Sequence, residues 1–397
     1  MAARVLTKVF KEFFESEKAG GLILVACTGL SILLANSGAG PGWLHFWHAR
    51  IDLSFGGIPL SYKVEEWVND GLMALFFLLV GLEIERELYI GELADLKQAL
   101  LPIMAALGGM VIPAGIHFAF SHDSPARAGF GIPMATDIAF SLGVLSLLGN
   151  KVPTSAKIFL TALAIIDDLG AIGVIAIFYT RSLSLAWLGG ALGIFGLLLL
   201  LNRLRVNKLV FYLVPGAIMW YCMLRSGIHA TLSGVLLAFA IPFRRASLSN
   251  PSETLQHWLH KPVAFCILPL FALANTGILL SGDWLRSLHS SNSLGIQAGL
   301  VIGKPAGILL FCWLSVRSGL CRLPEEVGWG QIAGLGVLAG IGFTMSIFIT
   351  NLAFEEGEII QFSKIAILLA SGVAGTLGFL ILRLQAHKNI LRPQIPV

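Results

Sequence analysis

Two adjacent aspartates, Asp167 and Asp168, lie in the middle of an apolar run that extends from residue 158 to 179. A run of that length can span a bilayer as a helix. Each aspartate at the centre of such a helix costs about 2.5–3.5 kcal/mol on insertion scales, so two neighbours persist only where they face a wet cavity or a partner. The pair therefore indicates a functional site inside a membrane.

Other ionisable groups share this setting. Asp137 and Lys304 lie well inside further apolar runs, and Glu83 lies at the end of another. Because Lys304 is the only basic residue in the membrane interior, a pairing with Asp167 or Asp168 is the simplest arrangement. The pair could be purely structural, but three buried acids then face one base. The surplus carboxylates must be protonated or hold a cation, which is what an ion carrier needs.

The composition agrees with a membrane setting. The chain is 56% hydrophobic and 13% charged, whereas soluble domains carry about 25% charged residues. Its five cysteines are scattered without the spacing of a disulfide framework or a zinc site. No run of five or more basic residues accompanies the net charge of +4, so the composition does not indicate a nucleic-acid partner. We expect a polytopic membrane protein, whose first partner is the lipid bilayer.

Twelve segments are predicted to span the membrane. Together with an interfacial helix at 1–18, they form one transporter domain over 1–397. The segments are 19–35, 65–88, 98–121, 129–148, 156–179, 184–201, 208–224, 227–242, 260–280, 294–316, 330–353 and 361–384. Of the 27 lysines and arginines, most fall in loops on the side of the two termini. This asymmetry predicts that both termini are cytoplasmic.

Residues 51–62 alternate apolar and polar side chains around Gly56 and Gly57, which is typical of a β-hairpin. An isolated two-stranded hairpin is only marginally stable in water. We therefore consider that it pairs with a second copy in a homodimer by edge addition. A hairpin that lies on its own loops is the alternative.

Glycines and prolines interrupt two of the predicted spans, at 129–137 and at 334–344, and a threonine follows each break, Thr136 and Thr344. Paired interruptions at corresponding positions indicate discontinuous helices and a binding site near the midplane. The groups of three spans at 98–179 and 294–384 then form inverted repeats. Asp137 and Lys304 have the right signs to compensate the exposed helix ends, although Asp137 could equally be an ordinary helix cap.

The predicted fold is thus an all-α polytopic membrane protein. It has about twelve transmembrane helices with inverted-topology repeats, two discontinuous helices that cross near the midplane, and a small periplasmic β-hairpin.

Six motifs together resemble the NhaA-type sodium/proton antiporters, and the resemblance covers nearly the whole chain. The motifs are Phe-Phe-Leu-Leu-Val-Gly-Leu-Glu at 76–83, Pro-Met-Ala-Thr-Asp-Ile-Ala-Phe at 133–140, Ala-Leu-Ala-Ile-Ile-Asp-Asp-Leu-Gly-Ala at 162–171, Ser-Gly-Ile-His-Ala-Thr-Leu-Ser-Gly at 226–234, Ile-Gly-Lys-Pro at 302–305 and Gly-Ile-Gly-Phe-Thr-Met-Ser-Ile-Phe-Ile at 340–349.

The resemblance implies a secondary active antiporter of the bacterial inner membrane and not an enzyme. It would exchange intracellular Na⁺ or Li⁺ for external H⁺ by alternating access, electrogenically and under pH control, in sodium and pH homeostasis. No cofactor is implied, and a homodimer would form through the 51–62 hairpin. Asp167 and Asp168 would bind Na⁺ or Li⁺ in competition with protons.

The resemblance also implies roles for residues around that site. Asp137, Lys304 and Thr136 would balance the broken helices, and Lys304 would interact with the second aspartate. Either lysine or aspartate could carry the second proton. Residues matching positions of the cytoplasmic funnel and the pH response are Glu83, Arg86, Glu87 and His229, although a histidine in such a span is often a packing residue.

Two positions depart from the best-studied members of the family. Gln256 replaces a glutamate of the pH-sensing cluster, and Glu85 replaces a lysine. We expect active exchange with a shifted or weakened pH dependence. Three other readings fit less well: an intramembrane aspartyl protease, which Lys304 disfavours; a channel, which would show a continuous polar stripe; and an organic-anion carrier, which would need a further basic residue.

Overall fold

A computed structural model describes residues 2–55, 59–180, 183–244, 250–280, 284–324, 326–355 and 357–391. The side chains at 2–18, 92, 96, 150 and 388–391 lie outside this description. The described chain is mostly helical, with one two-stranded sheet. It divides into two compact units. Unit 1 comprises Met1–Leu22, Asp95–Ala171 and Ser281–Val397, and unit 2 comprises Ile23–Ala94 and Ile172–Leu280.

Most of unit 1 consists of apolar helices. Its elements are the first part of α1 (Ala2–Ala35), α5 (Leu96–Ser121), η3 (Pro125–Met134), α6 (Ile138–Ser146), η4 (Gly149–Lys151), most of α7 (Thr154–Phe178), α13 (Trp284–Ser287), α14 (Ser291–Ala298), η6 (Gly299–Gly303), α15 (Lys304–Arg317), α16 (Trp329–Ala339), α17 (Phe343–Ala353) and α18 (Glu358–Leu391).

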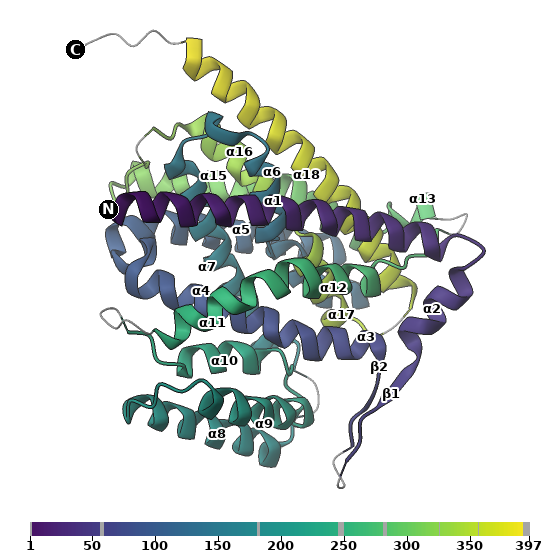
Figure 1. Cartoon of the computed structure of the whole chain (residues 1–397). Coiled ribbons are helices and arrows are strands. Elements are labelled where there is room, and N and C mark those ends of the chain that lie inside the picture. The colour runs from purple at the N-terminus through teal and green to yellow at the C-terminus, as the bar shows by residue number, and fades with distance from the viewer. Residues whose placement is uncertain are drawn as a thin grey trace. The chain divides into compact units, whose positions relative to one another are not determined.

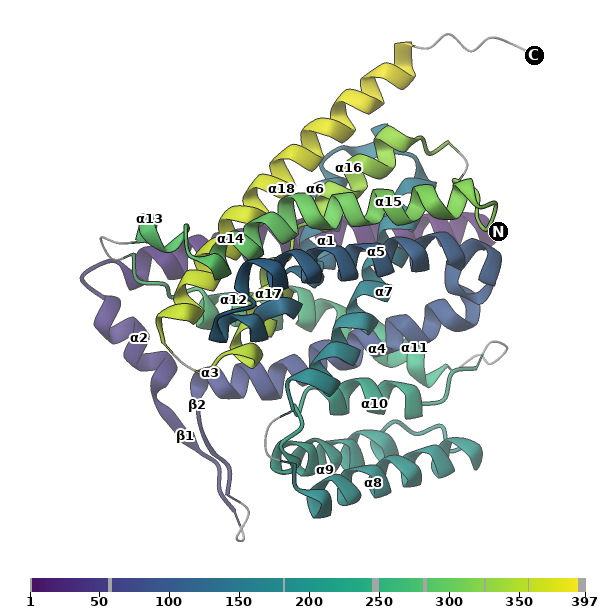
Figure 2. The same cartoon turned by 180° about the vertical axis from the view of Figure 1, so that it is seen from behind.

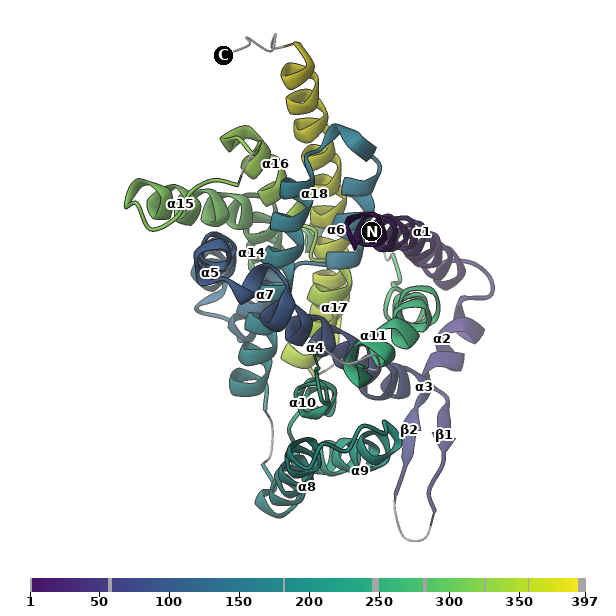
Figure 3. The same cartoon turned by 60° about the vertical axis from the view of Figure 1, so that its left-hand side comes forward.

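Unit 2 carries the sheet. Its elements are the rest of α1, α2 (Gly40–His48), β1 (Arg50–Asp52), β2 (Ser61–Lys63), α3 (Val64–Glu66), η1 (Trp67–Leu72), α4 (Met73–Ile90), η2 (Glu92–Ala94), the end of α7, α8 (Leu185–Arg203), α9 (Val210–Ser226), α10 (Leu232–Ala240), α11 (Pro251–Pro262), η5 (Val263–Ile267) and α12 (Leu268–Asn275). Within this unit α10 lies between α4 and the α8–α9 pair (Figure 3).

Within the described residues, seven helices are long and apolar enough to cross a membrane, or ten if each of three bent pairs counts as one crossing. The bent pairs are Ala19–Ala35 with Gly40–His48, Pro125–Met134 with Ile138–Ser146, and Trp329–Ala339 with Phe343–Ala353. The predicted segments 208–224 and 227–242 overlap the shorter helices α9 and α10. The nine residues of α10 extend about 14 Å at 1.5 Å per residue, about half of a bilayer core. A multi-pass membrane protein is confirmed, whereas twelve crossings remain a prediction.

The predicted hairpin is present between α2 and α3 (Figure 1). Its strands pair antiparallel, with Arg50 opposite Lys63 and Asp52 opposite Ser61. Beyond the strands, the Leu53 N–H donates to the Leu60 carbonyl at 2.9 Å. The predicted turn at Gly56 and Gly57 falls outside the described residues. The homodimer contact that we expect from this hairpin therefore stays a prediction.

Glycines allow α5 and α15 to run side by side in unit 1 (Figure 2). A Cβ atom added at Gly307 would overlap the Gly108 carbonyl oxygen, and it would lie 3.0 Å from Cβ of Ile112. Gly303, one turn earlier, faces Pro113 in the same way. Small residues four apart let two membrane helices approach closely. This close approach fixes the position of Lys304, the first residue of α15.

The close approach predicts a sharp difference between two glycines. Gly307→Ala places a methyl group against the backbone of α5, and overpacking of this kind costs about 1–3 kcal/mol. Gly115→Ala in α5 is the matched control, since nothing lies within 4 Å of an added Cβ there. We expect thermal unfolding of the purified protein to show a lower midpoint for the first variant only. Equal midpoints would contradict the packing described here.

Candidate functional site

Two bent helix pairs of unit 1 meet at their breaks. The pair η3–α6 bends by 41° and the pair α16–α17 by 45°. The two breaks touch, because the Asp137 N–H donates to the Ile341 carbonyl at 2.7 Å. The last residues before the breaks, Met134 and Ala339, are 205 positions apart, as are the first helical residues after them, Ile138 and Phe343. The predicted interruptions are thus confirmed, and each leaves two buried helix ends.

Asp137 supplies acceptors to both N-terminal ends. Its Oδ1 accepts the backbone N–H of Phe140 at 2.9 Å, which caps α6. Its Oδ2 accepts the backbone N–H of Thr344 at 3.1 Å and the Thr344 hydroxyl at 2.5 Å, at the start of α17. Gly342 is the N-cap residue of α17 and has no side chain to bond. One buried carboxylate therefore compensates the positive ends of two half-helices.

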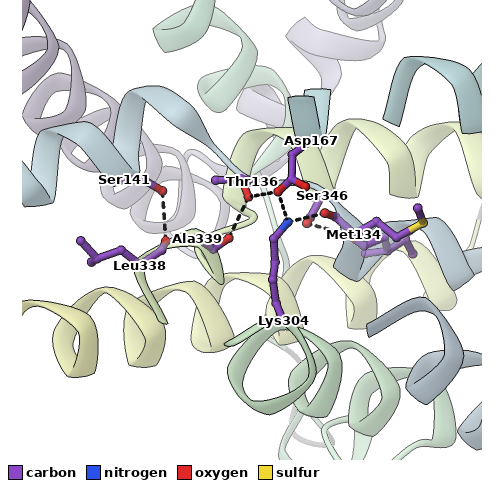
Figure 4. Close-up of polar contacts among 9 residues, drawn as sticks. Met134, Thr136, Ser141, Asp167, Lys304, Leu338, Ala339 and Ser346 are labelled. Atoms are coloured by element: carbon purple, nitrogen blue, oxygen red, sulfur yellow. Dashed lines mark hydrogen bonds and ion pairs between the residues drawn. The ribbon is translucent and has the colours of Figure 1, made fainter. Parts of the chain in front are cut away.

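The two C-terminal ends receive donors from across the break. The Lys304 ammonium donates to the carbonyl of Met134, and the Thr136 hydroxyl donates to the carbonyl of Ala339 at 3.0 Å. Serines complete the arrangement (Figure 4): Ser346 donates to the Ile132 carbonyl at 2.7 Å and Ser141 donates to the Leu338 carbonyl at 3.1 Å. Carbonyl oxygens that the broken helices leave without an intrahelical partner are thereby bonded.

Both serines were missed in the sequence. Ser141 and Ser346 are 205 positions apart, the same separation as the two half-helices. A comparison of the two broken segments at that separation could have found them. Each lies one turn into the second half-helix, from which it reaches back to the end of the other pair's first half-helix.

Asp167 on α7 is the centre of the cluster in Figure 4. Its Oδ2 lies 2.7 Å from the Lys304 ammonium nitrogen and 2.7 Å from the Thr136 hydroxyl oxygen. The single Thr136 hydroxyl proton is shared between this carboxylate and the Ala339 carbonyl. Both Asp167 and Lys304 are fully buried. The Oδ1 atom of Asp167 has no hydrogen-bond partner among the residues that the structure describes. The site therefore contains a buried ion pair and one carboxylate oxygen open to a proton or a cation.

The ion pair uses the first aspartate, whereas the family resemblance implies the second. Asp168 is also buried, with 1% of its surface exposed, and it acts on Lys304 electrostatically without being its ion-pair partner. Side chains at neighbouring helix positions point about 100° apart, so only one of the two faces the lysine directly. Lys304 itself follows the π-helical segment η6, a distortion found frequently at functional sites.

The residues expected at the funnel lie in unit 2, and most of them gather where α4 meets α11. Glu83 hydrogen-bonds to Gln256, and the Arg86 guanidinium donates to Glu87 at 3.0 Å. Glu85 is buried, and it accepts the Ser252 hydroxyl at 2.8 Å. The sequence did not indicate this serine, since a single serine in a polar stretch carries no signal. The glutamate at 85 is thus accommodated as a buried acceptor.

His229 lies apart from these residues. Its Nε2 atom is 2.8 Å from the Tyr179 carbonyl oxygen. It precedes α10, whose first turn contacts Ala74 through Gly234. Ala74 is nine positions before Glu83 on α4, about 14 Å along a helix. The structure therefore does not bring His229 to the glutamate cluster.

The chain matches the family described as Na⁺/H⁺ antiporter 1 over residues 11–382. It is 58% identical over 379 residues to a protein of Dechloromonas aromatica (strain RCB), covering 94% of this chain and 95% of that one. A protein of Cytophaga hutchinsonii is 56% identical, with 97% of each chain covered. One of Escherichia coli (strain UTI89 / UPEC) is 48% identical, covering 96% of this chain and all of that one. Each of these relatives carries the name Na⁺/H⁺ antiporter NhaA.

The double cap at Asp137 predicts that Thr344 contributes to stability beyond its volume. Thr344→Val keeps the shape but removes the hydroxyl donor, and a buried acceptor that loses a donor costs about 1–3 kcal/mol. Thr376→Val is the control, because among the described residues the Thr376 hydroxyl bonds only to the Gly372 carbonyl, at an exposed position of α18. We expect the midpoint of thermal unfolding to fall for Thr344→Val and to stay near the parent value for Thr376→Val. The reverse order would argue against a shared cap.

Proposed function

Since the chain belongs to the Na⁺/H⁺ antiporter 1 family, we propose that it exchanges cytoplasmic Na⁺ or Li⁺ for external H⁺ across the bacterial inner membrane. Members of this family are secondary transporters and not enzymes, they need no cofactor, and Na⁺ and H⁺ are their transported substrates. The cluster of Asp167, Asp168 and Lys304 is the proposed exchange site. The buried ion pair beside an open carboxylate oxygen is the observation that supports it most.

We propose that a cation and protons compete for Asp167 and Asp168. Burial in a low-dielectric site disfavours uncompensated negative charge, so each carboxylate requires a proton, a cation or an ammonium. In the state described here, Lys304 compensates Asp167. A Na⁺ or Li⁺ ion that binds both carboxylates replaces the ammonium as the counter-charge, and protons leave from Asp168 and Lys304. Two protons exchanged for one monovalent cation make the cycle electrogenic.

The arrangement of the chain in the membrane follows from the same proposal. Twelve crossings place both termini in the cytoplasm, and the groups 98–179 and 294–384 form the inverted repeats. The constant separation of 205 positions between the two broken helices supports these repeats, and the bias of basic residues toward one side supports the orientation. Alternating access then moves the crossing half-helices relative to the rest of the chain around a fixed site.

The 51–62 hairpin is the proposed homodimer contact. Ile51, Leu53 and Phe55 are exposed on and just beyond β1, with 83% of the Phe55 surface accessible. The strands leave unpaired edges, and an edge with exposed apolar side chains is suited to pairing with a second copy.

The cluster on α4 and α11 is the proposed pH-responsive mouth of the cytoplasmic funnel. It joins Glu83, Arg86 and Glu87 to Gln256. Because an amide does not titrate, Gln256 removes one ionisable group from this cluster. Glu85 adds a carboxylate nearby, where it is held by Ser252. His229 contributes at a different place, through its bond to the Tyr179 carbonyl.

Removing the charge at the second aspartate tests the exchange site. Asp168→Asn keeps the size of the side chain and eliminates one carboxylate, so we expect Na⁺-dependent and Li⁺-dependent proton flux in proteoliposomes to be lost. The purified variant should elute as the folded parent does. Asp123→Asn is the matched control, since Asp123 is exposed and pairs only with His122 in the described chain. Flux retained in Asp168→Asn would exclude this assignment.

The two departures at the funnel test the proposed pH response. We expect the parent to be active with a weakened increase of exchange in the alkaline range. Gln256→Glu restores a titratable group beside Glu83, so the rate should depend more steeply on cytoplasmic pH, and adding Glu85→Lys should strengthen the change. Gln98→Glu, at an exposed position of α5, is the control. A parent with a full alkaline activation that Gln256→Glu leaves unaltered would refute the role of position 256.

A further inference from the structure

A second set of buried polar side chains in unit 1 belongs neither to the ion pair nor to the helix caps. His117 on α5 is fully buried, and its Nε2 atom lies 3.1 Å from Oδ1 of Asn292 on α14. The Asn292 amide donates to the Ser363 hydroxyl on α18 at 2.7 Å. Ser363 in turn donates to the carbonyl of Ile359 at 2.6 Å. The proposed transport mechanism uses none of these groups.

The direction of these bonds fixes the tautomer of the His117 ring. Because the Ser363 hydroxyl donates its single proton to the Ile359 carbonyl, its oxygen accepts a hydrogen bond from the Asn292 amide nitrogen. The amide oxygen of Asn292 therefore points at His117, and an oxygen acceptor requires a proton on Nε2. The Nδ1 atom then carries a bare lone pair. A proton added there leaves the bond to Asn292 intact.

Two buried polar atoms at the end of α5 share one face of the helix. His117 Nδ1 and the Ser121 hydroxyl oxygen have no hydrogen-bond partner among the described residues. Ser121 follows His117 by four positions, so their Cβ atoms are about 5–6 Å apart, and the Ser121 side chain tilts toward His117. One water molecule bridging the two would supply a donor to Nδ1 and an acceptor to Ser121.

Two glycines leave room for the His117 ring to pack closely against a broken helix. A Cβ added at Gly295 would lie 2.9 Å from Cδ2 of the ring, and one added at Gly129 would lie 3.3 Å from its Cε1. Gly129 belongs to η3, which ends at Met134, the carbonyl partner of Lys304. The ring thus contacts the half-helix whose far end helps to form the ion site.

We propose that His117 Nδ1 and the Ser121 hydroxyl form a proton-binding site, distinct from Asp167 and Asp168, through which external pH adjusts exchange. The site lies near the end of α5 and the start of α18, which the proposed topology places on the external side. An imidazolium at His117 would be a charge without a bonded counter-charge among the described residues, in a fully buried site that touches η3 at Gly129, and burial of an unpaired charge is unfavourable. Protonation therefore weakens the packing of η3 on α5 and slows exchange.

Among the described residues, no charged group bonds to the His117 ring, and the polar partner of the ring is Asn292. The titratable groups on α5, on the other elements named here and next to them are Lys97 at the opposite end of α5, His122 and Asp123 after α5, Arg127 on η3, Lys304 and Arg317 on α15, Glu355 after α17, Glu358, Lys364, Arg383, His387 and Lys388 on α18, and His289 before α14. His122 and Asp123 are exposed and pair with each other at 2.7 Å, and Lys304 pairs with Asp167. A proton at His117 is thus a new charge and not part of an existing ion pair.

Nuclear magnetic resonance of the full chain in lipid bilayers, with ¹⁵N-labelled histidine, tests the proton site. His117→Gln assigns the signal, because glutamine keeps a donor for Asn292 and has no titratable ring. We expect that signal to show the Nε2–H tautomer at alkaline pH and to become an imidazolium as the pH is lowered. In Ser121→Ala the imidazolium should appear only at a lower pH. An Nδ1–H tautomer, or a ring that stays neutral throughout, would overturn the proposal.

Exchange measured at fixed internal pH and varied external pH tests the regulatory part, which rests on the proposed function. External acid should slow the parent more than His117→Gln, with equal dependence on internal pH in both. Identical external profiles would overturn the regulation. Absence of Na⁺-dependent flux in both proteins would instead refute the proposed antiport. The resonance experiment does not require transport, so it decides the proton site in either case.

Discussion

The structure depends on one electrostatic constraint, which is that two broken helices place four helix ends next to one another inside the protein. Two of these ends expose backbone N–H groups and two expose carbonyl groups. An unsatisfied backbone polar group in hydrocarbon costs several kcal/mol, so each end needs a hydrogen-bond partner. A single carboxylate, Asp137, serves both N-terminal ends. An ammonium, a threonine and two serines serve the C-terminal ends. The breaks persist because these side chains come from the opposite pair or from the adjacent helices.

The same compensation bears on the proposed exchange site. Lys304 is shared between a helix end, the Met134 carbonyl, and a carboxylate, Asp167. The Thr136 hydroxyl lies between the Ala339 carbonyl and Asp167, and its single proton is shared between these two acceptors. An ion that takes Asp167 away from Lys304 therefore alters the support of the crossing itself. We infer that occupancy and the conformation of the broken helices are coupled through these two shared side chains.

Much of the site could be predicted from the sequence because charges in membrane helices are rare. The free-energy cost of a charged side chain in a membrane helix was enough to single out Asp167, Asp168, Asp137 and Lys304, and the structure buries all four. The breaks followed from glycines and prolines, and the hairpin followed from its alternation. Each of these signals lies within a short stretch of sequence, so it can be recognised without knowledge of the packing.

Other features depend on three-dimensional packing and could not be predicted from the sequence. Which aspartate meets Lys304 depends on the rotation of α7, which the sequence does not fix, and the structure chooses Asp167. The double cap at Asp137 requires two segments about 200 positions apart to meet. The burial of Glu85 against Ser252 likewise joins α4 to α11. The number of membrane crossings could not be fixed for another reason, because the nine residues of α10 are too few for a full crossing.

Competition between sodium and protons for the aspartate pair is the central claim, and calorimetry of sodium binding to the purified protein tests it most directly. The heat of binding should be measured at one pH in two buffers that differ in ionisation enthalpy. If Na⁺ displaces protons from Asp168 and Lys304, the heats will differ by the number of protons released times the difference in buffer enthalpy, and more than one proton will leave per ion. Equal heats in the two buffers would mean that sodium binds without displacing protons, and the account would be contradicted.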